Sequence, residues 1–378
     1  MKEKIRILHI LPALNFCGGM ENYVMNYYRK IDRNKIQFDF ITHTDLENSF
    51  KNEVKVLGGK IYEFPVFKMG KIFSIIKLID RFFFEHKNDY KIIHCHMANA
   101  AYFYFKIAKK YGINIRILHS HQPSSADKIT HKIRNYPLLF LGNKLATHRV
   151  ACTKLAGEFL FRHKDFIVIK NAIDINKFKF NIDKRNKLRK ELGLENKFVI
   201  GHIGRFCAQK NQMFLLEIFK GILNKEKNSY LIMIGNGEDK EKIKNQVKNF
   251  DLLDKVKILP PCKNVNDYYQ IFDAFVFPSL YEGLGIVLIE AQCVGLKTYT
   301  SIENMPVKDL NITNLISFIS LNDGVEKWVD RILKDKANTI INNRIINYRN
   351  IIDNGYDINY ESILLEKYYM DLLRGCQV

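Results

Sequence analysis

The chain has 378 residues, 47% of them hydrophobic, which is typical of a globular protein too long for one ordinary core and predicts two domains. The sequence contains no uncharged run of about 18 residues, so no membrane-spanning helix is predicted. Seven scattered cysteines without a C-x-x-C pair favour a reducing cytoplasm over disulfides or a zinc site. The net charge of +19 implies an anionic partner, and nucleic acid, anionic membrane and phosphorylated small molecules all qualify.

Short aliphatic runs alternate with longer helical patterns along the chain, which is typical of βαβ units and parallel sheets. The first run, KIRILHIL, is interpreted as a strand and not as a signal peptide, because no small-residue cleavage site follows it. Helices are expected over residues 20–29 and 98–110. The other strands expected in the first half cover residues 36–42, 60–64, 90–96, 115–121, 148–153 and 166–172.

Gly18 and Gly19 lie between the first expected strand and the first expected helix. A glycine pair there would let the backbone approach a phosphate or a sugar, although a plain turn fits equally well. The G-x-G-x-x-G fingerprint of dinucleotide-binding proteins does not follow the first strand. The pair is therefore a weak binding signal by itself.

His119 and His121 end the strand expected over residues 115–121 and lie on one face of it, because side chains alternate along a strand. Either could donate to a sugar oxygen or transfer a proton, whereas a lone histidine is more often structural. His94 and His96 also end a strand. Without a companion ligand cluster in the sequence, they are interpreted as a strand end and not as a zinc site.

The pattern starts again after residues 174–196, which are interpreted as a charged linker with a short solvated helix. Arg205 and Lys210 follow the first strand of the second half, just before an expected helix. A helix N-terminus carries free N–H groups and partial positive charge, so two cations here favour a diphosphate site over a solvated loop. The sequence has no D-x-D that could hold Mg²⁺, so these cations would act without a metal. The strands expected here cover residues 198–204, 229–235, 255–260 and 273–279.

The segment SLYEGLGIVLIEAQ contains two acids around a glycine turn. Gly283 and Gly285 permit a tight turn whose N–H groups approach a ligand, and a helix follows from about Gly285. Glu282 precedes this helix, and Glu290 lies within it after four aliphatic residues. A buried carboxylate must be hydrogen-bonded or paired. A core cation and a pair of sugar hydroxyls would both satisfy Glu290, and the adjacent turn favours the hydroxyls.

The last pattern, ESILLEKYYMDLLRG, predicts an amphipathic helix beyond the strands of the second sheet, and we expect it to cross back onto the first domain. The apolar residues assigned mostly to one side of this helix are Ile363, Leu364, Tyr368, Leu372 and Leu373.

With these motifs assembled, the chain resembles the retaining glycosyltransferases of family 4, in the bacterial capsule and exopolysaccharide branch. The stretch FPSLYEGLGIVLIEAQCVG matches the E-x7-E signature of that family, with Glu282 and Glu290 as its two acids. The other matching stretches are CGGMEN, ILHSHQ, ACTKLAGEFLF, VIKNAID, GRFCAQKNQ and IGNGE. The resemblance implies the α/β GT-B fold, in which two Rossmann-like domains face a central cleft. The implied parts are an acceptor-side domain over residues 1–172, a nucleotide-sugar donor domain over 173–352 and a returning helix over 353–378.

The resemblance further implies a metal-independent, retaining transfer of a hexose or N-acetylhexosamine. The donor would be a nucleotide sugar, in most cases a UDP-sugar, and the acceptor a lipid-linked glycan of surface polysaccharide biosynthesis, with no cofactor. The implied catalytic residues are His119 near the anomeric carbon, Glu282, Arg205 and Lys210. The implied donor contacts are Arg205 and Lys210 on the diphosphate, Glu290 on the ribose, Glu282 with the amides of Gly283, Leu284 and Gly285 on the sugar, and Gly18 and Gly19 closing over the donor.

Three positions depart from the family pattern. Ala172 stands where glycine is usual and suggests a less extended turn. Leu284 stands where phenylalanine is commoner, which changes the volume beside the donor. Pro260 replaces a usual glycine near the expected base pocket, so the motif specifies the phosphate site more firmly than the base.

Residues 71–87 and 127–144 mix apolar and basic side chains. Each segment could dock on anionic lipid or form an ordinary packed helix with a solvated basic side. Their place in the first domain and the net charge favour peripheral contact with the cytoplasmic face of the membrane. Two other functions fit parts of the sequence, namely a sugar-nucleotide 2-epimerase of similar fold and a basic nucleic-acid-binding protein. A 2-epimerase lacks the E-x7-E arrangement that this sequence contains, and the sequence shows no recognised nucleic-acid-binding module.

Overall fold

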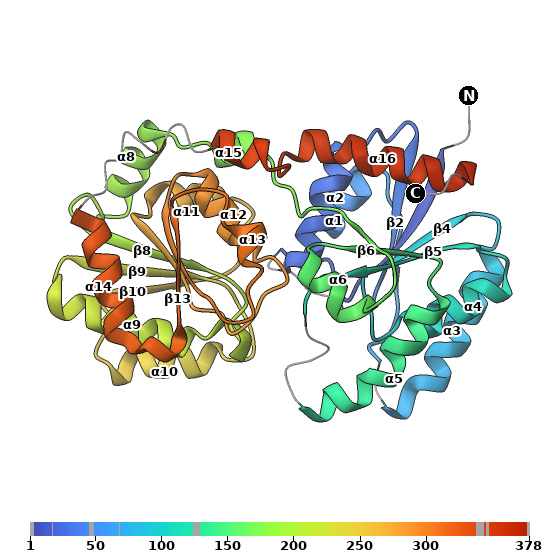
Figure 1. The fold of residues 1–378 in the computed structure, drawn as a ribbon, viewed down its shortest axis with the longest axis horizontal. Helices are drawn as coiled ribbons and strands as arrows, with labels where there is room; N and C mark the ends of the chain where they lie inside the picture. The colour runs from blue at the N-terminus through green and yellow to red at the C-terminus, as the bar shows by residue number, and fades with distance from the viewer. Residues whose placement is uncertain are drawn as a thin grey trace. The chain divides into compact units, whose positions relative to one another are not determined.

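The computed structural model describes residues 4–16, 18–44, 49–67, 69–123, 129–337, 344 and 348–375. The chain divides into two compact units, of which the first comprises Met1–Ala172 with Ile358–Val378 and the second Ile173–Asp357. Each unit contains one parallel sheet with helices on both faces (Figure 1). The predicted α/β class with two Rossmann-like sheets is therefore confirmed. The observed divisions follow residues 172 and 357, whereas the predicted ones follow residues 172 and 352.

The sheet of the first unit has seven strands in the order β3-β2-β1-β4-β5-β6-β7, and every neighbouring pair is parallel. Its strands are aliphatic because both faces of the sheet are covered. Ile7 packs on one face, and Leu8 and Ile10 pack on the other. The strands are β1 (Ile5–Ile10), β2 (Ile36–Thr42), β3 (Ile61–Glu63), β4 (Ile92–Cys95), β5 (Ile115–Ser120), β6 (His148–Ala151) and β7 (Ile167–Val168).

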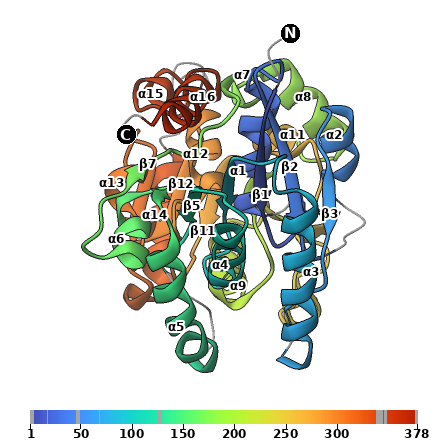
Figure 2. The ribbon, with the colours of Figure 1, turned by 90° about the vertical axis from the view of Figure 1, so that its right-hand side faces the viewer.

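Two layers of helices cover this sheet. The helices are α1 (Gly19–Lys30), α2 (Lys51–Val56), the 3-10 helix η1 (Met69–Lys71), α3 (Ile72–Glu85), α4 (Ala101–Lys110), α5 (Ile129–Leu145), α6 (Lys154–Phe161) and α16 (Ile358–Arg374). Helices α1 and α16 share one core, whereas α3, α4 and α5 lie on the other face with α4 in the middle (Figure 2). Among the described helices, none combines the length and apolar character needed to cross a bilayer.

Helix α16 belongs to the first unit, as the pattern predicted, but its packed side differs from the predicted one. The residues buried on this side are Ile358, Leu365, Tyr368, Tyr369 and Leu372. Their spacings of three, four and seven residues place them on one helical face. Ile363 and Leu364, which were assigned to the packed side, are 60% and 42% exposed, so that part of the prediction is wrong.

The sheet of the second unit has six parallel strands in the order β10-β9-β8-β11-β12-β13. Strands β12 and β13 were not predicted. Strand β12 is rich in hydroxyl groups, and its buried threonine and serine hydroxyls donate to backbone carbonyls, as Thr300 does to the carbonyl of Phe277 (2.9 Å). The strands are β8 (Phe198–Ile203), β9 (Ser229–Ile234), β10 (Val256–Leu259), β11 (Ala274–Phe277), β12 (Lys297–Ser301) and β13 (Ile316–Ile319).

The helices of this unit include the segment interpreted from the sequence as a linker with a solvated helix. That interpretation is wrong, because Arg185 and Arg189 in α8 are buried and both pair with Asp273. The helices are α7 (Ile175–Phe178), α8 (Ile182–Glu191), η2 (Ala208–Lys210), α9 (Gln212–Lys225), α10 (Lys240–Asn249), α11 (Val265–Ile271), α12 (Ile286–Cys293), α13 (Val307–Leu310), η3 (Leu321–Asp323), α14 (Gly324–Ala337) and α15 (Tyr348–Asp353).

In both sheets the first strand in the sequence lies in the middle, and the order of the later strands reverses direction beside it. The change lies between β1 and β4 in the first unit and between β8 and β11 in the second. Ligands of open parallel sheets bind outside the carboxyl ends of the strands at this point. The loops after these four strands are therefore where a site is expected in each unit.

Candidate functional site

Two loops leave the carboxyl ends of β8 and β11, and hydrogen bonds fasten them to each other. The N–H of Leu280 donates to the carbonyl of Gln209 (2.8 Å), and the side-chain amide of Gln209 donates to the carbonyl of Tyr281 (2.9 Å). The hydroxyl oxygen of Ser279 also lies 2.9 Å from the carbonyl oxygen of Gln209. These bonds bring Lys210 from one loop beside Glu282 from the other.

Lys210 and Glu282 form a largely buried ion pair. The Nζ atom lies 2.5 Å from Oε1 of Glu282, and the two side chains are only 16% and 6% exposed. Ser279 donates to the same carboxylate oxygen (2.6 Å), and the ring centroid of Phe277 lies 5.0 Å from Nζ. Motif reasoning named both charged residues, but not their contact. The two residues are 72 positions apart in the chain, so no local signal predicts their contact.

Arg205 lies in the same loop but on the surface. Its Nη2 atom is 3.0 Å from Oε2 of Glu238, and these side chains are 63% and 53% exposed. An exposed pair contributes little to stability, so an anionic ligand could replace Glu238 at low cost. Glu238 was not a sequence candidate. It follows β9, and the parallel pairing of β9 with β8 brings it to the same edge of the sheet.

The turn of Gly283, Leu284 and Gly285 leads into α12. Gly285 has a φ of 75°, a left-handed conformation that residues with side chains rarely adopt. The side chain of Leu284 is 2% exposed and belongs to the core of the unit. Only the backbone of Leu284 is therefore left for contact with a ligand. The N–H of Glu282 already donates to the carbonyl of Asn304 (3.2 Å).

Glu290 lies on α12 and contacts α11 through a tyrosine. The hydroxyl of Tyr269 donates to Oε2 of Glu290 (2.8 Å), and it is also 3.2 Å from the carbonyl oxygen of Val287. Burial raises the pKa of Glu290 to about 7, although the bond from Tyr269 opposes this shift. Within the described residues no lysine or arginine pairs with Glu290, so the core cation considered from the sequence is not its partner.

Gly18 and Gly19 begin α1 in the first unit, and the need for glycine differs between them. Gly18 has extended backbone angles that other residues adopt, but a Cβ atom there would lie 1.8 Å from Oε2 of Glu21. No atom lies within 4 Å of a Cβ built on Gly19. Gly18 thus leaves room for a largely buried carboxylate, which sequence reasoning missed.

Five histidines gather at the carboxyl ends of β1, β4 and β5. His119 and His121 lie on one face with ring centroids 4.0 Å apart, as alternation predicted, and Ser120 on the other face bonds to the carbonyl of Ala156 (2.6 Å). The register of the sheet pairs His9 with His94. His96 follows β4 and completes the cluster. The repeated H-x-H pattern was the sequence signal, but only the strand order shows that the two patterns meet.

The ring nitrogens of these histidines form two hydrogen-bonded chains. In the first, Tyr369 lies 2.7 Å from Nδ1 of His94, and Nε2 of His94 lies 3.0 Å from Nδ1 of His119. In the second, Nε2 of His96 lies 3.0 Å from Nδ1 of His9, and Nδ1 of His96 lies 2.8 Å from Nε2 of His121. Burial lowers the pKa of His9 and His121 to about 3 and keeps the imidazoles neutral.

The cluster contains two sets of three histidines whose nitrogen atoms lie within 4.8 Å of one another, which is a spacing that a metal could use. The ring planes are inclined to one another by 14° to 29° in the set His9, His94 and His96, and by 19° to 36° in the set His96, His119 and His121. Both ring nitrogens of His94 and of His96 already take part in hydrogen bonds, so a metal ion would have to replace these bonds.

Comparison with known families divides the chain in the same way as its two sheets. Residues 17–177 match the family described as Glycosyltransferase Family 4, and residues 184–351 match Glycosyl transferases group 1.

Several relatives match along most of the chain. EpsF of Bacillus subtilis, which is named as a glycosyltransferase, is 30% identical over 342 residues and 88% of each chain. An Escherichia coli protein is 25% identical over 81% of this chain and 80% of its own, and is named UDP-Gal:alpha-D-GlcNAc-diphosphoundecaprenol alpha-1,3-galactosyltransferase. CapH of Staphylococcus aureus, named as a capsular polysaccharide biosynthesis glycosyltransferase, is 28% identical over 76% of this chain and 78% of its own.

Among solved structures, the chain is similar to HepE of Anabaena in complex with UDP and glucose. The TM-score is 0.78, and the match covers 97% of this chain and 99% of HepE. The sequence identity is 18%, so this likeness shows the shared fold.

Proposed function

Because the chain belongs to glycosyltransferase family 4, we propose that it transfers a hexose or N-acetylhexosamine from a UDP-sugar to a lipid-linked glycan in surface polysaccharide biosynthesis, with retention of configuration. The names of the E. coli and S. aureus relatives support the donor, the acceptor and the role in polysaccharide synthesis. Membership of this family favours a glycosyltransferase over the two alternative functions, a 2-epimerase and a nucleic-acid-binding protein. The observation that carries the proposal is the Lys210–Glu282 pair at the carboxyl ends of β8 and β11.

In the proposed reaction, Lys210 stabilises the negative charge that develops on the departing diphosphate. A cation held in a largely buried site acts more strongly on such charge than one in water. A phosphate oxygen that approaches Nζ competes with Glu282 for it. The carboxylate of Glu282 is then free to accept hydrogen bonds from hydroxyls of the sugar. The pair thus keeps both groups in position and satisfied until a ligand engages them.

Arg205 and Glu290 would bind the other parts of the donor. Arg205 is exposed and can exchange Glu238 for a diphosphate oxygen, with little change in folding stability. Glu290 can accept hydrogen bonds from the two ribose hydroxyls, because among the described residues only Tyr269 donates to its carboxylate and burial raises its pKa. The chain's own cations serve the diphosphate in this proposal, so no metal cofactor is invoked.

We propose that His119, whose ring is buried in this structure, contacts the substrate once the donor binds. We also propose that the first unit makes a peripheral contact with anionic lipid. The lipid-facing surface consists of Phe73, Lys77, Arg81 and Phe84 on α3, of which the two phenylalanines are 85% and 59% exposed. Apolar rings that enter the interface beside cations that meet lipid phosphates are typical of interfacial helices.

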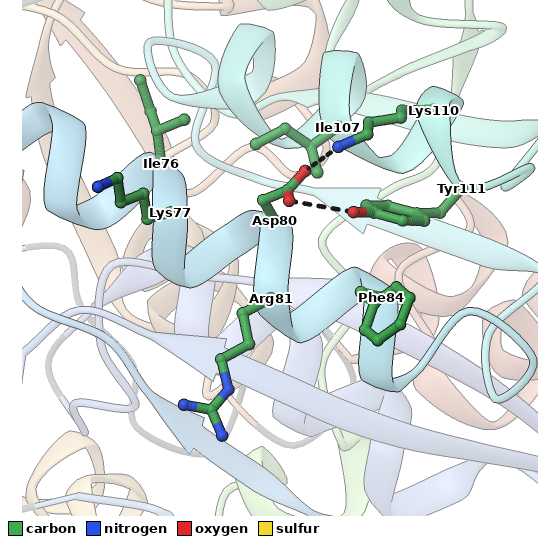
Figure 3. A pocket seen from close by; sticks show the side chains of 8 residues that line it. All are labelled: Ile76, Lys77, Asp80, Arg81, Phe84, Ile107, Lys110 and Tyr111. Atoms are coloured by element: carbon green, nitrogen blue, oxygen red, sulfur yellow. Dashed lines mark hydrogen bonds and ion pairs between the residues drawn. The ribbon is translucent and has the colours of Figure 1, made fainter.

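A groove of about 530 Å³ lies between α3 and α4, at the end of these helices that leads into the amino ends of β4 and β5. Figure 3 shows Asp80 turned toward Lys110 and Tyr111 across the groove, at 2.7 and 3.0 Å, whereas Arg81 points away from them. The ion pair of Asp80 with Lys110 therefore spans the groove, which lies away from the carboxyl ends of the strands. In the second basic segment, Tyr136 and Phe140 of α5 are also exposed, and residues 124–128 lie outside the described residues.

The proposal is tested in two steps. A thermal-shift screen of UDP-, GDP- and ADP-sugars should show a rise in melting temperature with UDP-sugars, because a ligand of the native state stabilises it. The best donor is then assayed with a polyprenyl-diphosphate-linked sugar, in EDTA and in Mg²⁺, and the anomeric configuration of the product is read by NMR. Transfer that is abolished by EDTA, or a product of inverted configuration, would contradict the metal-independent retaining mechanism.

A further inference from the structure

Tyr369 on α16 is a fully buried residue whose hydroxyl meets one polar atom. In the described part of the chain its only hydrogen-bond partner is Nδ1 of His94, at 2.7 Å. Burial raises the pKa of Tyr369 well above its ordinary value, so the hydroxyl keeps its proton. Either direction of the chain leaves one buried hydrogen without an acceptor among the described residues, on the hydroxyl of Tyr369 or on Nε2 of His119. A phenol is a stronger hydrogen-bond donor than an imidazole N–H, and an imidazole nitrogen is a stronger acceptor than a phenol oxygen, so Tyr369 donates to His94.

This donation decides which nitrogen of His94 carries the proton. A neutral imidazole has one N–H group and one lone pair, and burial keeps His94 neutral by lowering its pKa well below the ordinary value. Because Nδ1 accepts from Tyr369, the hydrogen of His94 is on Nε2. That N–H points to Nδ1 of His119, at 3.0 Å, which accepts it.

The same reasoning reaches the end of the chain. We infer that Tyr369, through His94, holds His119 in the tautomer with its hydrogen on Nε2, so that His119 offers a hydrogen-bond donor and no basic nitrogen. The Nε2 atom is buried and has no partner within the described residues. The ring of Tyr23 packs edge-on against His119 at 4.9 Å, and its hydroxyl is likewise buried and unpaired there. The ligand group that suits this donor is an oxygen of a sugar or a phosphate.

The second chain of the cluster provides a comparison inside the same molecule. His9, His96 and His121 bond in sequence, but both outer nitrogens, Nε2 of His9 and Nδ1 of His121, lack a partner in the described residues. No hydroxyl therefore fixes the direction of the hydrogens in that chain. Tyr369 and His94 thus act as positioning residues for His119 alone.

The tautomer can be measured without an activity assay. Protonated and unprotonated ring nitrogens have well-separated ¹⁵N shifts, and labelled histidine in the whole protein gives the pattern of each ring, with His119→Asn identifying its signals. We expect a protonated Nε2 in His119 of the wild type, both tautomers in Tyr369→Phe, and no change in Tyr368→Phe, which removes the neighbouring hydroxyl. A hydrogen on Nδ1 of His119 in the wild type overturns the inference, and this result does not require Tyr369→Phe to fold. A ¹⁵N pattern of the wild type that shifts on addition of stoichiometric Zn²⁺ also overturns it.

The catalytic consequence rests on the proposed function. Tyr369→Phe should lower kcat/KM in proportion to the fraction of His119 that NMR finds without a hydrogen on Nε2, which is about twofold for equal populations of the two tautomers. Tyr368→Phe should leave kcat/KM unchanged, because it does not alter the tautomer of His119. If His119→Asn keeps full transfer activity while the wild type shows the expected tautomer, the proposed contact of His119 with the substrate is wrong and the inference about its tautomer stands.

Discussion

Glu290 makes a measurable prediction about stability, because burial raises its pKa from an ordinary 4.5 to about 7. When a carboxyl ionises less readily in the folded chain, the unfolded chain releases its proton first as the pH rises. No free energy is lost below about pH 4.5, where both states are protonated, and the loss is complete above about pH 7. Glu290→Gln keeps the shape of the side chain and removes the ionisation, so we expect it to remove this pH dependence.

The magnitude follows from the two pKa values. The difference between 4.5 and about 7 corresponds to about 3 kcal/mol of unfolding free energy once both states are ionised. At pH 5 the unfolded chain is already partly ionised, so about 2.5 kcal/mol remains to be lost between pH 5 and pH 8. The wild type should lose this amount relative to Glu290→Gln, while the other titrating groups cancel in the comparison. The variant should also bind the donor more weakly.

The chain offers a local probe for this experiment. Trp328 is its single tryptophan and is fully buried in the second unit, which also contains Glu290. Urea unfolding followed by tryptophan fluorescence at pH 5 and pH 8 therefore reports the unit that matters. Glu195→Gln makes the same chemical change at an exposed site of that unit and should shift stability by less than about 0.5 kcal/mol. If Glu290→Gln and the wild type lose the same stability between the two pH values, the reasoning about Glu290 is wrong.

Three further outcomes are expected. Lys210→Gln leaves the carboxylate of Glu282 buried without its cation, so it should lower the unfolding free energy by about 3 kcal/mol and kcat by about a hundredfold. Urea unfolding and transfer assays that show neither loss would contradict a role for the ion pair. Arg205→Gln should raise the donor KM by about tenfold with a stability change below about 0.5 kcal/mol, and a large fall in melting temperature would contradict its exposed placement. Phe73→Ser should reduce sedimentation with anionic vesicles, whereas Val56→Ser, at an equally exposed position on α2, should not. Equal binding by both variants, or binding insensitive to salt, would remove the lipid contact.

The sequence alone determined the features that depend on neighbouring residues. Aliphatic runs of strand length gave the parallel strands, since both faces of such a strand are buried. Alternation gave the shared face of His119 and His121. The E-x7-E spacing gave both acids of the second unit. Where local pattern and packing diverged, prediction failed, as in the hydroxyl-rich strand β12 and the exposed Ile363 of α16.

The tertiary structure decided which groups are partners. The pairing of Lys210 with Glu282 depends on two loops that meet because β8 and β11 are adjacent in the sheet. The hydrogen position on His119 depends on a hydroxyl contributed by α16, some 250 residues later in the chain, which acts through His94. Ionic and hydrogen-bonded contacts form over a few ångströms in space, and their direction follows from burial. The spacing of residues along a sequence gives neither the distance between two side chains nor their burial, so only the folded chain determines which groups are partners.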